Sequence, residues 1–120
     1  MGRLNLKRGE VYLVNFDPTV GREIQKTRPA IVLQNDISNR HSDITIVAAI
    51  SSKFGPKLYP TEVLIKTGEA GMKVESVILL NQIRSIDHLR IIKRLGNVAK
   101  ETLKSVDRGI AISMGLVTLE

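Results

Sequence analysis

Short apolar runs rich in β-branched residues follow one another from residue 10 to residue 95, and polar segments separate them. Runs of this kind are typical of β-strands. Two of them, residues 29–35 and 44–51, are almost continuously apolar, which predicts strands buried on both faces. The expected strands are residues 10–16, 29–35, 44–51, 61–65, 77–83 and, with a weaker pattern, 90–95.

The period of the pattern changes near the C-terminus. Apolar residues recur there at intervals of three and four, namely Ala99, Leu103, Val106, Ile110, Met114 and Val117. This spacing predicts an amphipathic helix, with Asn97 as its N-cap and Glu101 in its first turn. A short helical turn is also expected within residues 36–40. The whole pattern predicts a mainly β (α+β) fold, a small antiparallel barrel or curled sheet closed by one C-terminal α-helix.

Length and composition limit the possible functions. The chain has 120 residues, which suits a single domain spanning residues 1–120. Its 18 Lys and Arg against 12 Asp and Glu give a net charge of +6, which favours an anionic partner, either nucleic acid or an acidic protein. The sequence contains no cysteine, so disulfides, thiolate metal sites and a cysteine nucleophile are excluded.

The sequence predicts no association with a membrane. Its apolar runs are far shorter than the roughly 20 residues of a membrane-spanning helix. The first ten residues also lack the apolar centre of a signal peptide. We therefore expect a soluble, cytoplasmic protein without a membrane partner.

Several common catalytic motifs are missing from the sequence. A phosphate-binding glycine-rich loop, a nucleophile elbow and an HExxH pair are all absent. His41 and His88 have polar neighbours and are expected to be solvated. Asp36, His41 and Asp43 could suggest a set of metal ligands, but a polar turn needs the same residue types, so no metal site is expected.

Polar residues at strand ends are the most informative feature. Pro29 cannot donate a ladder hydrogen bond and so marks the start or the edge of a strand, and Arg28 stands directly before it. Ser51 ends another strand and Arg84 follows a third. Such groups could converge on one rim and hold a phosphate. Taken alone, the residues favour a structural alternative in which Arg28 pairs with Glu23 and Ser51 only ends its strand.

Five segments occur in the order and spacing of one protein family. They are residues 7–12 (KRGEVY), residues 17–29 with Asp17-Pro18, Gly21, Glu23 and Arg28-Pro29, residues 30–36, residues 46–51, and residues 76–87 (SVILLNQIRSID). Together they resemble the MazF/PemK family, the toxins of bacterial toxin–antitoxin pairs. The resemblance extends from about Lys7 to the C-terminal helix.

The resemblance implies a fold, an activity and partners. The family has a Src-homology-3-like barrel with a C-terminal helix, and its members form homodimers. They are ribosome-independent endoribonucleases that cut single-stranded RNA, such as mRNA, at short sequences. They use no metal or cofactor and leave a 2′,3′-cyclic phosphate and a 5′-hydroxyl. Together with the basic charge, the resemblance implies a cognate MazE-like antitoxin with an acidic, disordered tail.

The resemblance also assigns catalytic residues. The family's catalytic arginine falls on Arg28 and its loop carboxylate on Glu23. Its catalytic hydroxyl falls on Ser51, where the family usually has threonine. Because a guanidinium loses its proton only above pH ~12, Arg28 and Ser51 are better suited to stabilise the phosphorane, while Glu23 or water takes the proton.

Base edges and backbone phosphates are expected to contact the loops and strand ends. Only four aromatic residues are present, which favours hydrogen-bonded recognition of bases over stacking. Tyr59 is a candidate for stacking on one base, although a packing role is an equal alternative. The expected RNA-binding residues are Arg22, Lys26, Asn35, Arg40, Lys57, Tyr59, Gln82 and Arg84.

Two other functions remain open from the sequence. The first is a CcdB-like growth inhibitor, which would use the same barrel to bind a protein target such as gyrase. The second is a non-catalytic module that binds nucleic acid without cutting it. Fold alone does not separate these alternatives from a nuclease, because function depends on the site.

Overall fold

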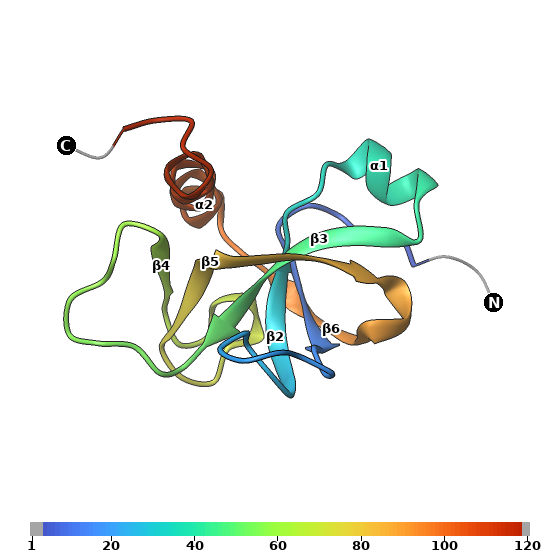
Figure 1. Cartoon of the computed structure of the whole chain (residues 1–120), viewed down its shortest axis with the longest axis horizontal. Helices are drawn as coiled ribbons and strands as arrows, with labels where there is room; N and C mark the ends of the chain where they lie inside the picture. Colours follow the sequence, from blue (N-terminus) through green and yellow to red (C-terminus); the bar gives the residue numbers. More distant parts are fainter. Residues whose placement is uncertain (1–3, 119–120) are drawn as a thin grey trace.

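The computed structural model describes residues 4–118, and within them six strands, two α-helices and two short 3-10 turns follow one another (Figure 1). In chain order these are β1 (Glu10–Asn15), β2 (Thr27–Val32), α1 (Asp36–His41), β3 (Ile44–Ser51), β4 (Glu62–Ile65), η1 (Glu69–Gly71), β5 (Ser76–Asp87), η2 (His88–Arg90), β6 (Ile91–Asn97) and α2 (Lys100–Ser113). The mainly β fold with a C-terminal helix is thus confirmed.

The strands form one antiparallel sheet in the order β4-β5-β3-β2-β1-β6. The sheet curls until η1, which follows β4, packs against β6. At this seam the two backbones touch. A Cβ atom on Gly71 would lie 2.4 Å from the Leu95 carbonyl oxygen, and one on Gly96 would lie 2.8 Å from the Ala70 carbonyl carbon. Glycine is therefore required on both sides of the seam that closes the barrel.

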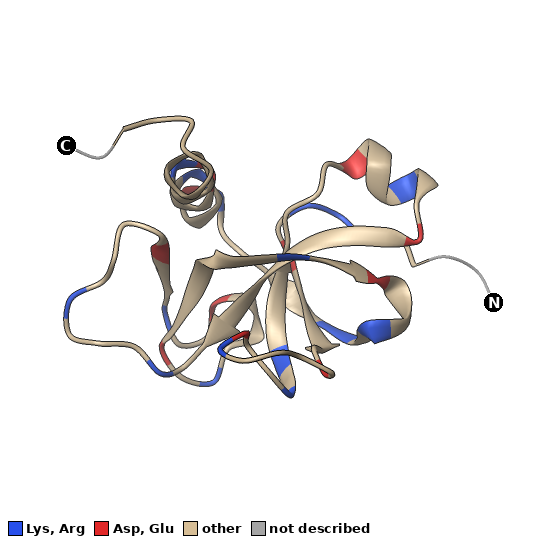
Figure 2. Ribbon diagram, in the orientation of Figure 1, with Lys and Arg blue, Asp and Glu red and all other residues tan. Residues whose placement is uncertain are grey.

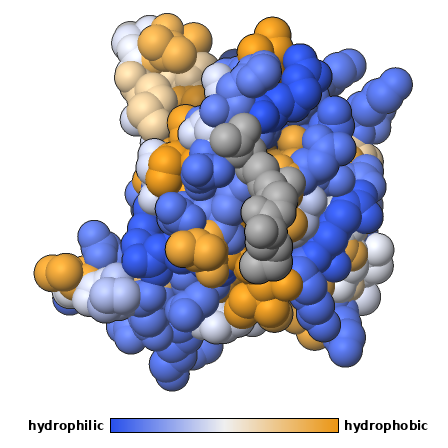
Figure 3. All heavy atoms as spheres, turned by 90° about the vertical axis from the view of Figure 1, so that its right-hand side faces the viewer, coloured by the Kyte–Doolittle hydropathy of each residue, from blue (hydrophilic) through white to orange (hydrophobic). Residues whose placement is uncertain are grey.

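Consecutive residues of the central strands face two different cores. Val11, Ile31 and Ala48 belong to one core, which α2 covers through Val106. Tyr12, Ala30, Val32, Val47 and Ala49 belong to the other, which Leu6 and Phe16 complete. This alternation confirms that β2 and β3 are buried on both faces. Outside the cores, the side of the molecule seen in Figure 3 is mostly hydrophilic, with apolar side chains only in separate spots.

The strand bounds follow the pairing partners more closely than the apolar runs. β3 has the predicted bounds. β2 begins two residues earlier than predicted because Thr27 pairs with Asn15 of β1, and it ends at Val32. Pro29 is tolerated there because the pairing with β3 begins only at Ala30. β5 continues beyond Ile83 to Asp87 because its polar second half still pairs with β3.

The start of α2 differs from the prediction. Asn97 is the last residue of β6 and not a helix cap. The N-cap position is Ala99, whose side chain cannot accept a hydrogen bond. The carboxylate of Glu69 in η1 supplies the cap instead, accepting hydrogen bonds from the Ala99 N–H at 3.0 Å and the Thr102 hydroxyl at 2.6 Å. The helix ends at Ser113, before the positive φ of Gly115, and does not reach Val117.

Within residues 4–118, no helix is both long and apolar enough to span a membrane.

Candidate active site

The register of β2 and β3 brings Arg28 and Ser51 to the same place. Ala30 pairs with Ala49 and Val32 with Val47. When this register is continued by two residues, Arg28 stands opposite Ser51. Facing residues of an antiparallel pair project from the same side of the sheet, so both side chains lie on the side of Ala30 and Ala49.

Only one nitrogen of the Arg28 guanidinium donates a hydrogen bond within the described residues. Its Nε donates a hydrogen bond to the Gln25 carbonyl at 2.9 Å, and no other partner occurs among the described residues. The Glu23 carboxylate instead accepts from the Val20 N–H at 2.7 Å. The Arg28–Glu23 ion pair of the structural alternative is therefore absent from residues 4–118, and the terminal amino groups of Arg28 can bind an anion.

Ser51 is the last residue of β3, and its hydroxyl is hydrogen-bonded. The residue is 7% exposed. Its Oγ accepts a hydrogen bond from the Lys53 N–H at 3.1 Å and donates to the Lys53 carbonyl at 3.4 Å. The donated bond is long and therefore weak. The hydroxyl can redirect its proton to a substrate oxygen by rotation about the Cβ–Oγ bond, while Oγ keeps the hydrogen bond from the Lys53 N–H.

A hollow of about 240 Å³ lies between the β1–β2 connection and β5, and neither Arg28 nor Ser51 is among its lining residues. Glu23 and Ile24 line it from the connection, and Gln82 and Arg84 line it from β5. Gln82 uses its side-chain oxygen to accept a hydrogen bond from the Ile24 N–H at 3.2 Å, which leaves its amide NH₂ available as a donor. The hollow thus combines a carboxylate with an amide donor.

The other predicted RNA-binding residues lie in two places. Arg22 and Lys26 are exposed on the β1–β2 connection next to Arg28, and Lys57 and Tyr59 are exposed on the connection that begins after Ser51. Tyr59 is 72% exposed, so its ring has no packing role. Figure 2 shows several Lys and Arg residues, with a few acidic ones, along the edge of the molecule that lies lowest in that view.

Asn35 and Arg40 are not brought to this edge. They belong to the α1 region, at the opposite end of β2 from Arg28 (Figure 1). The Asn35 side chain accepts a hydrogen bond from the Ser38 N–H at 2.8 Å and so caps α1. The structure therefore places both residues away from Arg28, and their role as RNA-binding residues stays a prediction.

Comparison with known proteins assigns the chain to a family. Residues 7–114 match the model of the PemK-like, MazF-like toxins of type II toxin–antitoxin systems. The chain belongs to this family. It is 41% identical over 112 residues to the endoribonuclease EndoA of Bacillus subtilis (strain 168), covering 93% of this chain and 97% of that protein. The predicted family and the predicted endoribonuclease class are confirmed.

Solved structures agree with this MazF-like assignment. MazF from Deinococcus radiodurans superposes with a TM-score of 0.81 at 26% identity, over 93% of this chain and 98% of that one. A mycobacterial endoribonuclease in complex with its cognate antitoxin superposes with a TM-score of 0.78 at 18% identity, over 95% of this chain and 99% of that one. The second likeness supports the fold alone.

In this MazF-like toxin, two arginines hold the connection that carries Glu23. Arg84 donates from Nη1 to the Phe16 carbonyl at 2.8 Å, and its guanidinium carbon lies 5.9 Å from the centre of the Phe16 ring. Arg90 donates to the carbonyls of Asn15 and Asp17. Arg84 thus helps to position the connection, and because it also lines the hollow, its contact with RNA stays a prediction. Arg90 has the same positioning role, and no sequence motif singles it out.

The histidines and acidic residues of the toxin form no further site. Among residues 4–118, no three His, Asp or Glu side chains gather as a metal-binding group. His41 is exposed as expected. His88 is not, because both of its ring nitrogens are buried and lack hydrogen-bond partners. Its backbone N–H donates to the Asp43 carbonyl, which holds η2 against the segment before β3.

A hydrogen-bonded cluster on β1 and β6 contains a titratable group with a clearly shifted pKa. Burial, and then the hydrogen bond to Glu10 at 3.0 Å and its negative charge, raise the pKa of Tyr12 to about 12. Glu10 also accepts a hydrogen bond from Arg94 at 2.8 Å. The cluster joins β1 to β6 and takes no part in the candidate active site.

Proposed function

We propose that this toxin cleaves single-stranded RNA without the ribosome, at short sequences, by attack of the RNA's own 2′-oxygen. The β2–β3 register supports this proposal, because continuing it two residues beyond the Ala30–Ala49 pair aligns Arg28 with Ser51. The hollow lined by Glu23 and Gln82 adds support, because it offers a proton acceptor and a hydrogen-bond donor on the connection that leads to Arg28.

The residues present can perform each step. As the O2′–P bond forms, Glu23 or a water molecule takes the proton from the 2′-hydroxyl. The phosphorane that results carries additional negative charge, which the free amino groups of Arg28 bind as a fork. The Ser51 hydroxyl donates to another phosphorane oxygen. The P–O5′ bond then breaks and the 5′-oxygen is protonated by water, which leaves a 2′,3′-cyclic phosphate and a 5′-hydroxyl.

The same edge suits the partners expected for such a toxin. We place the protein in the cytoplasm as a homodimer that acts on mRNA. A cognate antitoxin with an acidic, disordered tail would be attracted by the net charge of +6 and would cover the RNA site as its tail orders. The related mycobacterial endoribonuclease, solved with its antitoxin, is consistent with this assembly.

Cleavage of a long single-stranded RNA in the presence of EDTA tests the proposal. The wild type should give discrete fragments with cyclic-phosphate ends, and so should the control Arg108→Ala, which removes an exposed arginine of α2. Arg28→Ala should leave the RNA intact. Uncut RNA with the wild type would refute the nuclease, and growth arrest without RNA cleavage would instead support a CcdB-like inhibitor.

The division of roles can be tested separately. If Arg28 binds the phosphorane through its planar fork, Arg28→Lys should lower kcat strongly, because lysine keeps the charge but loses the fork. Near-normal turnover in Arg28→Lys together with inactivity in Glu23→Gln would contradict the role given to Arg28.

A further inference from the structure

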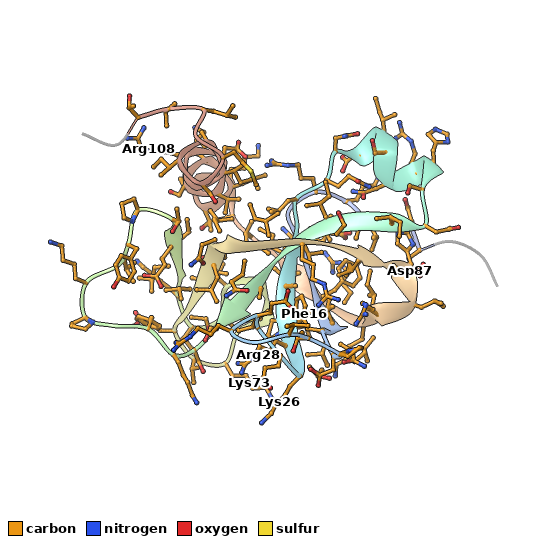
Figure 4. All side chains as sticks on the ribbon, in the orientation of Figure 1. Phe16, Lys26, Arg28, Lys73, Asp87 and Arg108 are labelled. Atoms are coloured by element: carbon orange, nitrogen blue, oxygen red, sulfur yellow. The ribbon has the colours of Figure 1, made fainter. Side chains whose placement is uncertain are left out.

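A second pocket adjoins Arg28 and has no part in the steps above. It has a volume of about 410 Å³ and lies between the start of β2, the segment 71–74 that precedes β5, and β6. Arg28, Lys73 and Lys93 line it, and Figure 4 labels Arg28 and Lys73 near the start of β2. We call it the Lys73–Lys93 pocket.

The positive charges of this pocket are not neutralised within the described chain. No Asp or Glu among residues 4–118 lines it. The side chains of Lys73 and Lys93 make no ion pair or hydrogen bond with the part of the protein that the structure describes. Like charges around one hollow raise the local positive potential, so the pocket favours an anionic ligand.

The lining of the pocket is more apolar than polar, and a simple anion would leave this apolar part unused. Pro29, Ile50, Met72 and Leu95 contribute to it. The thioether of Met72 is a favourable neighbour for an aromatic ring. Hydroxyl groups of Ser52 and Ser76 supply polar partners at the wall. A ligand that joins an anionic group to a flat ring with polar edges matches this combination, and a nucleotide is such a ligand.

The position of the pocket connects it to the candidate active site. Arg28 stands opposite Ser51 and also lines the Lys73–Lys93 pocket. The next residue after Ser51 is Ser52, and it lines the pocket as well. Ser52 projects from the opposite face to Ser51, so an RNA chain with a phosphate at Arg28 would pass around the start of β2 to place its adjacent nucleotide in the pocket.

From these observations we propose that the Lys73–Lys93 pocket binds the nucleotide next to the cleaved bond, with Lys73 and Lys93 on its phosphate and the apolar wall against its base. The proposal rests on the proposed RNA cleavage and adds a subsite to it. The pocket is already formed without RNA, because Gly71 and Leu95, which both line it, belong to the tightly packed seam between η1 and β6.

The experiment compares Lys73→Gln/Lys93→Gln with a matched control, Lys100→Gln/Lys104→Gln. The control removes the same charge from exposed positions on α2, outside the pocket. The probe is a mixed-sequence single-stranded RNA that is 2′-O-methylated, so it binds without being cut, and affinity is measured by fluorescence anisotropy at several salt concentrations. Cleavage of unmodified RNA is measured in parallel.

The pocket variant should bind the probe about tenfold more weakly than the control variant. Its slope of log affinity against log salt should be shallower by about 0.7 for each phosphate that the variant no longer neutralises. Its KM for RNA should rise while kcat stays close to that of the wild type. Equal affinity and equal slope in the two variants would overturn the proposal. A pocket variant with a changed oligomeric state and unchanged RNA binding would also overturn it, because the pocket would then be a contact between subunits.

The experiment distinguishes failure of the pocket proposal from failure of the proposed function. If the wild type cuts unmodified RNA and the two variants behave alike, the function stands and the pocket proposal fails. If the wild type neither binds the probe nor cuts RNA, the proposed function itself fails.

Discussion

Arginine residues near the β1–β2 connection differ in how far their guanidinium groups are committed. Arg90 binds two backbone carbonyls, whereas Arg84 and Arg28 each bind one, Arg84 through Nη1 and Arg28 through Nε, and Arg84 also lies over the Phe16 ring. A sequence cannot distinguish these cases, because each arginine contributes the same charge to the total. The catalytic role that the family resemblance gives Arg28 and the RNA contact expected of Arg84 both stay predictions, and the structure adds that Arg84 also holds the Phe16 carbonyl.

Ser51 provides a test at the scale of one hydroxyl group. Ser51→Ala should lower kcat by about 100-fold or more, because a hydrogen-bond donor to the phosphorane is lost. Ser51→Thr should keep most of the activity, since it retains the hydroxyl. Single-turnover cleavage measures both effects. Thermal unfolding is the control, because Ser51→Ala also removes a hydrogen bond with Lys53 worth about 1 kcal/mol. Equal turnover in the wild type and Ser51→Ala would exclude a catalytic hydroxyl at this position.

Tyr12 gives a prediction about pH. Its pKa is raised from 10.0 to about 12 in the folded protein, so between these values the unfolded state has released a proton that the folded state still holds. Stability from this group is therefore complete below pH 10 and is lost as the pH rises toward 12. Urea unfolding of the wild type and Tyr12→Phe at several alkaline pH values measures the difference. The fall in unfolding free energy should be less steep in Tyr12→Phe. Identical pH profiles would show that the phenol is not coupled to folding.

Secondary-structure elements were predictable wherever the apolar pattern was long and unbroken. β3 is the clearest case, since all of its residues are apolar or β-branched until Ser51 ends the strand. The second half of β5 was missed because Arg84, Ser85 and Asp87 interrupt the apolar run, although this half pairs with β3. Pairing partners come from distant parts of the chain, so a local pattern does not reveal them.

The seam between η1 and β6 gives a prediction for two glycines. Gly71→Ala should destabilise the protein by about 2 to 3 kcal/mol, because the new methyl group meets the Leu95 carbonyl in a backbone conformation with φ of +77°. Gly68→Ala is the matched control, since its φ is also positive but nothing lies within 4 Å of the added atom. It should cost about 1 kcal/mol. Denaturant unfolding measures both, and equal losses would mean that the close contact contributes nothing.

At the scale of the whole molecule, the candidate site is built from segments that are far apart in the chain. Arg28 comes from the start of β2, Ser51 from the end of β3 and Gln82 from β5. The resemblance to the MazF/PemK family carried Arg28, Ser51 and Glu23 onto the chain, and spacing alone could not show that they gather. Lys73 and Lys93 were not predicted, because a lone lysine on a loop or an edge strand gives no signal of the pocket that it lines.

Because the Glu69 carboxylate caps the start of α2, the stability of this helix depends on the barrel. Its first turn is completed by a carboxylate that lies about 30 residues earlier in the chain, and short helices are marginal in water without such help. An isolated peptide with the sequence of α2 would therefore be mostly non-helical in water. α2 is an element that the barrel makes possible, and transplanting it to another protein would require Glu69 and its turn to be moved with it.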